Sequence, residues 1–208
     1  MATVFRILAV LPLLIFGSAQ AASITYYLNN TNANPYLADG PNYLSVTVTD
    51  GVTFGLDTDA VRFDVAILAA MPASSGGSYG IQQFRFNSDL TLAVANIVGM
   101  PVLWTANAAP PPNQGDGFGS FTVGVDDSNN PVDPLTFYVS NVAGDTIANY
   151  YFLSSGGQTQ GYSHVAAHVR GFVDQDPACC DVDANNIEDD ACITTSGWFG
   201  DMDENVVP

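Results

Sequence analysis

The sequence contains no lysine and only four arginines, whereas it has 19 aspartates and two glutamates. The formal net charge is therefore −17 at pH 7. The phosphates of nucleic acids and anionic lipid surfaces repel a chain with so little positive charge, which argues against both as partners. The same charge favours solubility and attracts divalent cations.

Long hydrophobic runs are also lacking. The longest, Ile7–Phe16, includes Pro12 and is half as long as the ~20 apolar residues that a membrane-spanning helix needs. It follows a short segment with one basic residue and precedes the small-residue motif Ala19-Gln20-Ala21. This pattern is typical of a secretory signal peptide. We expect cleavage after Ala21, which leaves a secreted mature chain without a membrane span.

Cysteine is scarce and confined to one region, with Cys179, Cys180 and Cys192 as its only occurrences. An exported chain can form a disulfide. We expect Cys180, or alternatively Cys179, to pair with Cys192, closing a loop whose stabilisation is ~3 kcal/mol in the loop-entropy model. The remaining cysteine would be free or would form an intermolecular bond.

Helical periodicity is missing, since no stretch keeps a 3.6-residue period over three turns. The best helix candidate, Asp89–Val98, is rich in β-branched residues and could equally form a strand. Short segments with alternating polarity recur instead, separated by Gly, Pro, Asn and Asp, and they predict an all-β fold. The expected strands are Ser23–Leu28, Tyr43–Thr49, Ala60–Leu68, Ile81–Asn87, Leu90–Val98, Val102–Ala106, Phe118–Val125, Leu135–Val142, Tyr150–Ser154 and His164–Val173.

These strands predict a single antiparallel β-sandwich of the jelly-roll type, with a closed barrel as the alternative. The expected organisation is a signal peptide at 1–21, a β-sandwich domain at 22–173 and an irregular acidic segment at 174–208. The acidic segment holds all three cysteines and the apolar island Gly197–Gly200.

One stretch resembles a cation-binding loop. Asp181, Asp183 and Asn185 are spaced like the first oxygen ligands of a calcium loop, and Asp189 follows them. The EF-hand pattern then fails, because Asn186 stands in the glycine position and Cys192 replaces the bidentate glutamate. We therefore expect at most a looser calcium site at Asp181, Asp183, Asn185 and Asp189, or else a solvated acidic loop. No other cofactor is indicated.

The pair His164 and His168 has the i, i+4 spacing of metal ligands on a helix, but its surroundings alternate like a strand. On a strand the two positions lie ~13 Å apart, so we interpret the histidines as structural or surface residues. No glutamate lies between them, which excludes the zinc-protease motif.

The sequence shows no complete set of catalytic residues either. No dinucleotide-binding or phosphate-loop glycine motif is present. With 21 acidic residues, a pair of carboxylates carries no information. We expect no catalytic residues and therefore a protein that is not an enzyme. Trp104, Trp198 and the nine tyrosines could form a platform for stacking sugars, although such side chains more often belong to the core.

Several segments taken in order form a recognisable series. They are Ile24–Leu28, Tyr43–Val48, Gly80–Phe84, Asp116–Phe121, Val165–Val169 with Gly171-Phe172, and Cys192–Gly200. Together they resemble the PEP-CTERM proteins, exported proteins of Gram-negative bacteria. The resemblance implies sorting by an exosortase and association with exopolysaccharide and biofilm matrix. Such proteins usually end in a Pro-Glu-Pro-like motif, an apolar helix and a basic tail, whereas this sequence ends at Val206-Val207-Pro208, where that tail would begin.

The function that these observations predict is non-catalytic. We expect a secreted protein of the cell surface or extracellular matrix, associated with exopolysaccharide or other matrix proteins. The alternative is a carbohydrate- or calcium-binding β-sandwich module. Exposed aromatic side chains on one face would favour the alternative.

Overall fold

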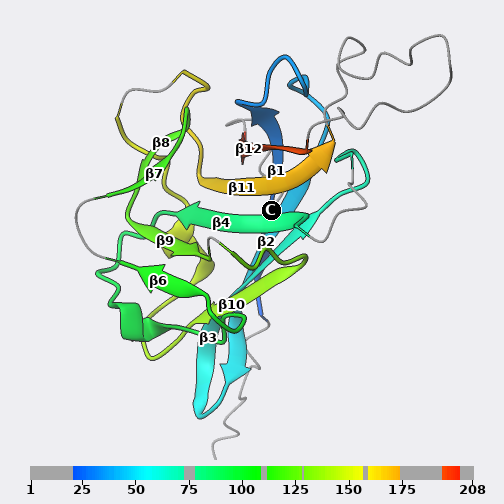
Figure 1. The fold of residues 1–208 in the computed structure, drawn as a ribbon. Helices are drawn as coiled ribbons and strands as arrows, with labels where there is room; N and C mark the ends of the chain where they lie inside the picture. The colour runs from blue at the N-terminus through cyan, green and yellow to red at the C-terminus, as the bar shows by residue number, and fades with distance from the viewer. Residues whose placement is uncertain are drawn as a thin grey trace, which may run out of the picture.

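The structure is a computed structural model that describes residues 21–72, 78–108, 112–127, 129–156, 159–173 and 194–201. Its fold is all-β, as the alternating segments predict (Figure 1). The strands are β1 (Ser23–Thr31), β2 (Leu44–Phe54), β3 (Asp57–Ile67), β4 (Gly80–Phe86), β5 (Ile97–Val98), β6 (Thr105–Asn107), β7 (Asn113–Gly115), β8 (Gly119–Phe121), β9 (Val123–Asp126), β10 (Leu135–Val139), β11 (Val165–Val173) and β12 (Thr194–Asp201). Two short 3₁₀ helices are η1 (Val94–Asn96) and η2 (Ile147–Tyr150).

Ten of the strands form one antiparallel sheet. Its order is β5-β10-β3-β2-β1-β12-β11-β4-β9-β6, and β7 pairs with β8 in a separate hairpin. Figure 1 shows β11 and β4 running side by side across strands β2 and β3, which point in a different direction. The sheet is therefore strongly curved, and it does not lie in one plane.

Phenylalanine rings from distant strands meet in the core. Phe63 of β3 lies 4.7 Å from Phe86 of β4, measured between ring centroids, although four strands separate β3 from β4 in the sheet. Phe137 of β10 stacks on Phe63 at 4.8 Å and also packs against Phe86 at 5.7 Å. Because such contacts join the two halves of one sheet, the sheet folds over its own apolar face and encloses the core.

This architecture differs from the expected sandwich in one respect. The two halves face each other as sandwich layers do, but a continuous ladder of hydrogen bonds through β1, β12 and β11 connects them. The sheet is thus nearly barrel-shaped, close to the alternative drawn from the sequence. Irregularities in the registers of β2–β3 and β11–β12 increase the local twist and help the sheet to bend.

Strand β12 lies in the middle of the sheet, between β1 and β11. Its residues, Thr194–Asp201, belong to the segment 174–208 that the sequence assigns outside the β domain. Glycines conceal this strand in the sequence, since they are unfavourable in strands. The structure requires them here, because a Cβ at Gly200 would lie 2.5 Å from the Phe118 ring and one at Gly197 would lie 2.8 Å from the Cβ of Ala33.

Most of the other expected strands are present with shifted ends. Phe118–Val125 is divided between β8 and β9, and Val102–Ala106 overlaps β6 only at Thr105 and Ala106. Leu90–Val98 contains η1 and the two-residue β5, and Tyr150–Ser154 begins at the last residue of η2 and forms no strand of the sheet. Among the described residues, no helix is long and apolar enough to cross a membrane.

Candidate functional site

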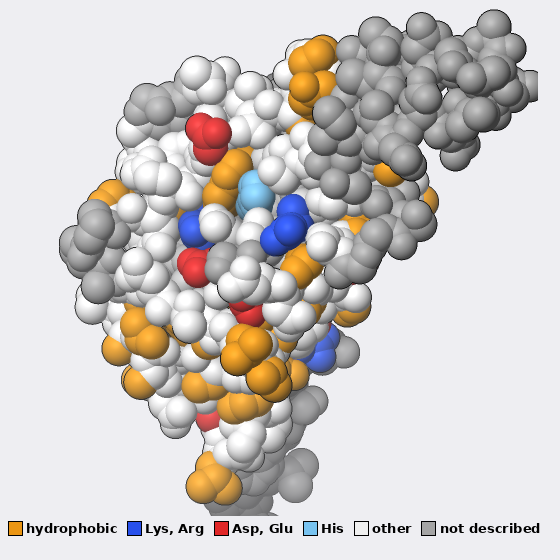
Figure 2. Space-filling model, in the orientation of Figure 1, with side chains coloured by type: hydrophobic (Ala, Val, Ile, Leu, Met, Phe, Trp, Pro, Cys, Tyr) orange, Lys and Arg blue, Asp and Glu red, His pale blue; other side chains and the backbone are white. Residues whose placement is uncertain are grey.

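The outer face of β4, β11 and β12 gathers the basic side chains that are rare elsewhere. Val165, Ala167 and Val169 of β11 point into the core, so Ala166, His168 and Arg170 share the opposite face. On β12, the residues that pair with Ala166, His168 and Arg170 are Gly200, Trp198 and Ser196, in that order. On β4, they are Arg85, Gln83 and Gly80. Figure 2 shows a histidine between two basic side chains on the face that β4 and β11 present.

Arg85 is a buried member of this face. Its guanidinium carbon lies 5.4 Å from the centre of the Trp198 ring, and its Nη1 lies 3.5 Å from Asp126 Oδ2. It also donates hydrogen bonds to the carbonyls of Val125 and Gln114. Burial lowers the pKa of Arg85, and Asp126 opposes that shift. These contacts join β4, β9 and the β7–β8 hairpin, so the main role of Arg85 is structural.

His168 occupies the centre of the same face. Its ring lies 5.3 Å from the Trp198 ring, and its Nδ1 is buried with no hydrogen-bond partner among the described residues. Burial, together with the charges of Arg85 and Arg170, lowers the pKa of His168 to about 4. The imidazole is therefore neutral at pH 7, and its buried Nδ1 makes no hydrogen bond to the described residues.

A polar pocket of about 460 Å³ opens beside Arg170. The described residues that line it are Ser78, Gln82, Arg170, Gly171, Thr195 and Ser196. These residues supply a guanidinium, an amide and three hydroxyl groups. None of them carries a carboxylate, although acidic residues outnumber basic ones by 21 to four in the whole chain. Hydroxyl, amide and guanidinium groups are the donors that fix a polar ligand in a pocket.

The two histidines singled out in the sequence have different surroundings. His164 precedes β11 and is buried, with its Nδ1 2.7 Å from Asp201 Oδ2 and its ring 5.3 Å from that of Tyr26. His168 packs on Trp198. The interpretation of both as structural residues agrees with these contacts, and no group of three or more His, Cys, Asp or Glu side chains among the described residues could hold a metal.

Ser163, His164 and Asp201 lie together but are not arranged for nucleophilic catalysis. The Ser163 hydroxyl hydrogen-bonds Asp201 and the Val165 carbonyl, whereas a nucleophilic serine must bond the histidine. A second serine has the spacing of a nucleophile elbow, Gly76-x-Ser78-x-Gly80. Strand β4 follows it directly, whereas an elbow leads from a strand into a helix.

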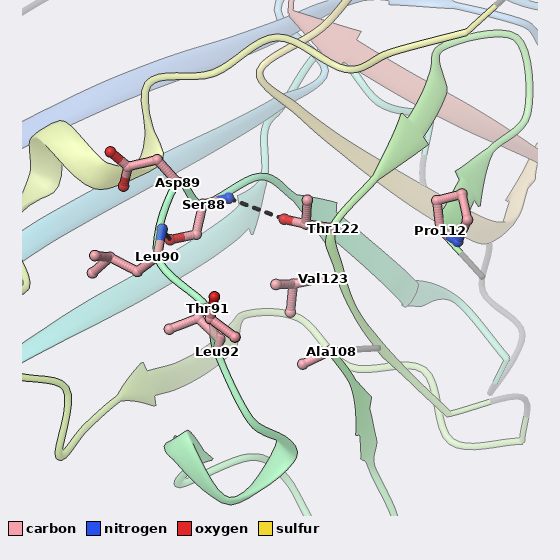
Figure 3. A pocket seen from close by; sticks show the side chains of 9 residues that line it. All are labelled: Ser88, Asp89, Leu90, Thr91, Leu92, Ala108, Pro112, Thr122 and Val123. Atoms are coloured by element: carbon pink, nitrogen blue, oxygen red, sulfur yellow. Dashed lines mark hydrogen bonds between the residues drawn. The ribbon is translucent and has the colours of Figure 1, made fainter. Parts of the chain in front are cut away.

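Another pocket, of about 330 Å³, lies between the loop 88–92 and the strands beside it (Figure 3). Leu90, Leu92 and Val123 give it an apolar part, and the Ser88 amide donates to Thr122 Oγ1 at its edge. Its one carboxylate, Asp89, accepts a hydrogen bond from Asn149. With no basic side chain in its lining, this pocket offers few groups that would orient a polar ligand.

Exposed aromatic residues concentrate in one stretch of the chain. Tyr151, Phe152 and Tyr162 are 49%, 42% and 53% exposed, and Leu153 beside them is 42% exposed. We call these four residues the aromatic segment. Of the aromatic residues that the structure describes, only Tyr36 is similarly exposed. Trp104 and Trp198 are both buried, so neither tryptophan forms the sugar platform considered from the sequence.

Local hydrogen bonds hold the aromatic segment in place. The Ser154 amide donates to the Ser163 carbonyl, and the Ser163 amide donates to the Ser154 hydroxyl. The ring of Tyr151 lies 4.9 Å from the His164 ring and 6.5 Å from that of Tyr26. One part of the Tyr151 ring is thus packed against fixed neighbours while the rest remains exposed.

The remaining sequence expectations lie outside the described residues. They are the calcium ligands Asp181, Asp183, Asn185 and Asp189, and the disulfide between Cys180, or Cys179, and Cys192. Both stay predictions. The sequence analysis included Tyr151 and Tyr162 only among all nine tyrosines, and it did not name Phe152 or Arg170. Nothing in their local pattern separates an exposed aromatic residue or an arginine in a pocket from ordinary strand and loop residues.

No family model, no curated protein and no solved structure matches this chain.

Proposed function

We propose that this protein is a non-catalytic, secreted component of the cell surface or extracellular matrix that binds polysaccharide through the aromatic segment. The observation that carries the proposal is the exposure of Tyr151, Phe152 and Tyr162 within a stretch of 12 residues. Two hydrogen bonds join Ser154 to Ser163 and so bring the residues before these serines, Leu153 and Tyr162, near each other. Exposed apolar side chains that lie together mark binding surfaces.

The chemistry of these rings suits carbohydrate. An aromatic face offers apolar area to the C–H groups of a sugar ring, and the tyrosine hydroxyl can bond sugar hydroxyls at the edge. Because Tyr151 is already packed against His164 and Tyr26, little conformational entropy is lost when a ligand stacks on it. The strong negative charge leaves a neutral or weakly acidic polysaccharide as a better partner than nucleic acid.

The location in this proposal rests on the sequence. The signal-peptide pattern at 1–21 and the resemblance to the PEP-CTERM proteins support secretion and an association with exopolysaccharide.

Affinity electrophoresis in gels containing soluble polysaccharides tests the proposal. The mature protein should be retarded by at least one polysaccharide, and the retardation should fall at least about tenfold in Tyr151→Ala with Tyr162→Ala, the loss of two stacking contacts of about 1 kcal/mol each. Tyr36→Ala is the matched control, since it removes an exposed tyrosine elsewhere and should leave retardation unchanged.

Two outcomes would contradict the proposal. Equal retardation of the double variant and the wild type would show that the aromatic segment is not the binding surface. No retardation across neutral and acidic polysaccharides would favour the purely structural matrix protein that the sequence also predicts.

A further inference from the structure

We infer that the polar pocket beside Arg170 is a second binding site, separate from the aromatic segment, which takes a sugar unit bearing a carboxylate. Its lining of one guanidinium, one amide and three hydroxyl groups matches the groups of a hexuronate, which carries one carboxylate and several hydroxyls. The site stands whether or not the aromatic segment binds polysaccharide.

The described lining of the pocket includes one basic side chain and no acidic one. Of the three arginines that the structure describes, Arg62 forms an ion pair with Asp64 at 2.6 Å, and Arg85 is buried against Trp198. Arg170 lines the pocket, and none of the described residues that line it carries a carboxylate. A guanidinium has five donors in a planar fork, which suits a bidentate contact with a carboxylate even when one donor is already engaged.

A β-bulge shapes this site. The register between β11 and β12 shifts between Arg170 and Phe172, and Gly171 lies at the shift with φ +76°. A Cβ at Gly171 would lie 2.7 Å from the Ser78 carbonyl oxygen, so only glycine lets the chain before β4 approach β11 so closely. Bulges commonly redirect a side chain beside a binding site, and here the bulge directly follows Arg170.

His168 lies two residues from Arg170 on the same face. Its Nδ1 has no partner among the described residues, and the ring is packed against Trp198. His168 is not among the described residues that line the pocket, so its contribution to the site is the packing that fixes the strand beside Arg170. A pocket of about 460 Å³ is within the size range of small-molecule sites.

Calorimetric titration of the mature protein with methyl glucuronide, methyl glucoside and acetate tests the inference. The two sugars differ only at C6, where one has a carboxylate and the other a hydroxymethyl group. Methyl glucuronide should bind at least about tenfold more tightly than either control, since it alone uses both the guanidinium and the hydroxyl groups. Equal binding of methyl glucoside, or equal binding of acetate, would overturn the inference.

Variants locate the site. Arg170→Gln should weaken methyl glucuronide binding at least about tenfold through loss of the charge-assisted contact. Arg62→Gln removes the same charge from β3 and should change the affinity less than about twofold, since surface charge acts weakly at a distance. Equal losses in both variants would assign the effect to overall charge and contradict the pocket.

A second substitution, which should not disturb the fold, tests the hydroxyl groups of the pocket. Ser196→Ala removes the hydroxyl of the residue that pairs with Arg170 at an exposed position of β12, so the strand should keep its packing. It should weaken methyl glucuronide severalfold while leaving acetate unchanged. If Ser196→Ala leaves the binding of the sugar unaffected, the hydroxyl groups of the pocket do not recognise it.

Discussion

Asp145 is a buried carboxylate whose ionisation is opposed by its surroundings. It is 2% exposed, and its Oδ2 accepts a hydrogen bond from the Tyr150 hydroxyl at 2.6 Å, while its Oδ1 has no partner among the described residues. Burial raises the pKa of Asp145 to about 6, and the charges of Asp59 and Asp50 add to this shift. At pH 7 the native state therefore holds an ionised carboxylate in an unfavourable place.

Stability should consequently fall as pH rises through this pKa. Between the ordinary value near 4 and about 6, the native state binds a proton at Asp145 that the unfolded chain has already lost, so this group favours folding in mild acid. Asp145→Asn should raise the free energy of unfolding at pH 7.5 by about 1–2 kcal/mol and have little effect at pH 4. Urea unfolding at both pH values measures the difference.

Asp57 supplies a control of opposite sign. Hydrogen bonds from the Asn141 and Asp59 amides and from Ser140 lower its pKa, so its ionised form stabilises the fold at neutral pH. Asp57→Asn should therefore destabilise the protein at pH 7.5 and matter less in acid. The lowered pKa of His168 also reduces the stability of the protein as pH falls below about 6.5. Each variant is therefore compared with the wild type at the same pH, where the contribution of His168 is the same. An Asp145→Asn variant that is less stable than wild type at pH 7.5 would refute the account of this residue.

At the scale of elements, β12 depends on Asp201 at its end. Asp201 Oδ1 accepts hydrogen bonds from the His164 and Val165 amides, and Oδ2 contacts His164 Nδ1. Asp201→Ala should lower the free energy of unfolding by at least about 3 kcal/mol, because it leaves several buried donors unpartnered. Asp116→Ala, at an exposed position, should change it by less than about 0.5 kcal/mol. Chemical unfolding of both variants provides the test, and equal stability of the two would exclude Asp201 as the anchor.

The sequence predicts these elements unevenly, for physical reasons. Alternation in Tyr43–Thr49 and Ala60–Leu68 reflects one buried face, and both segments are strands. The alternation fails in Thr194–Asp201, where close contacts with Phe118 and Ala33 require glycines that weaken the strand pattern. The pocket beside Arg170 was equally hidden, because its lining comes from three separate segments that only the curved sheet and the bulge at Gly171 bring together.

For the whole molecule, closure of one sheet explains both the core and the surface. Rings from β3, β4 and β10 fill the interior, which leaves the outer face of β4, β11 and β12 and the loop after η2 to carry polar and aromatic groups. The polar pocket beside Arg170 lies on the first of these surfaces, and the aromatic segment lies on the second. A rigid sheet that displays separate contact surfaces suits a protein that joins polysaccharide chains.

The most direct test of the central claim is an aromatic ¹H–¹³C NMR titration of the mature protein with the oligosaccharide of a polysaccharide that retards it. The account predicts that the ring signals of Tyr151, Phe152 and Tyr162 shift together and saturate, because sugar rings stack on these side chains. The Tyr36 signals should stay unchanged. Saturable binding that leaves Tyr151, Phe152 and Tyr162 unshifted would contradict the claim that the aromatic segment is the polysaccharide-binding surface.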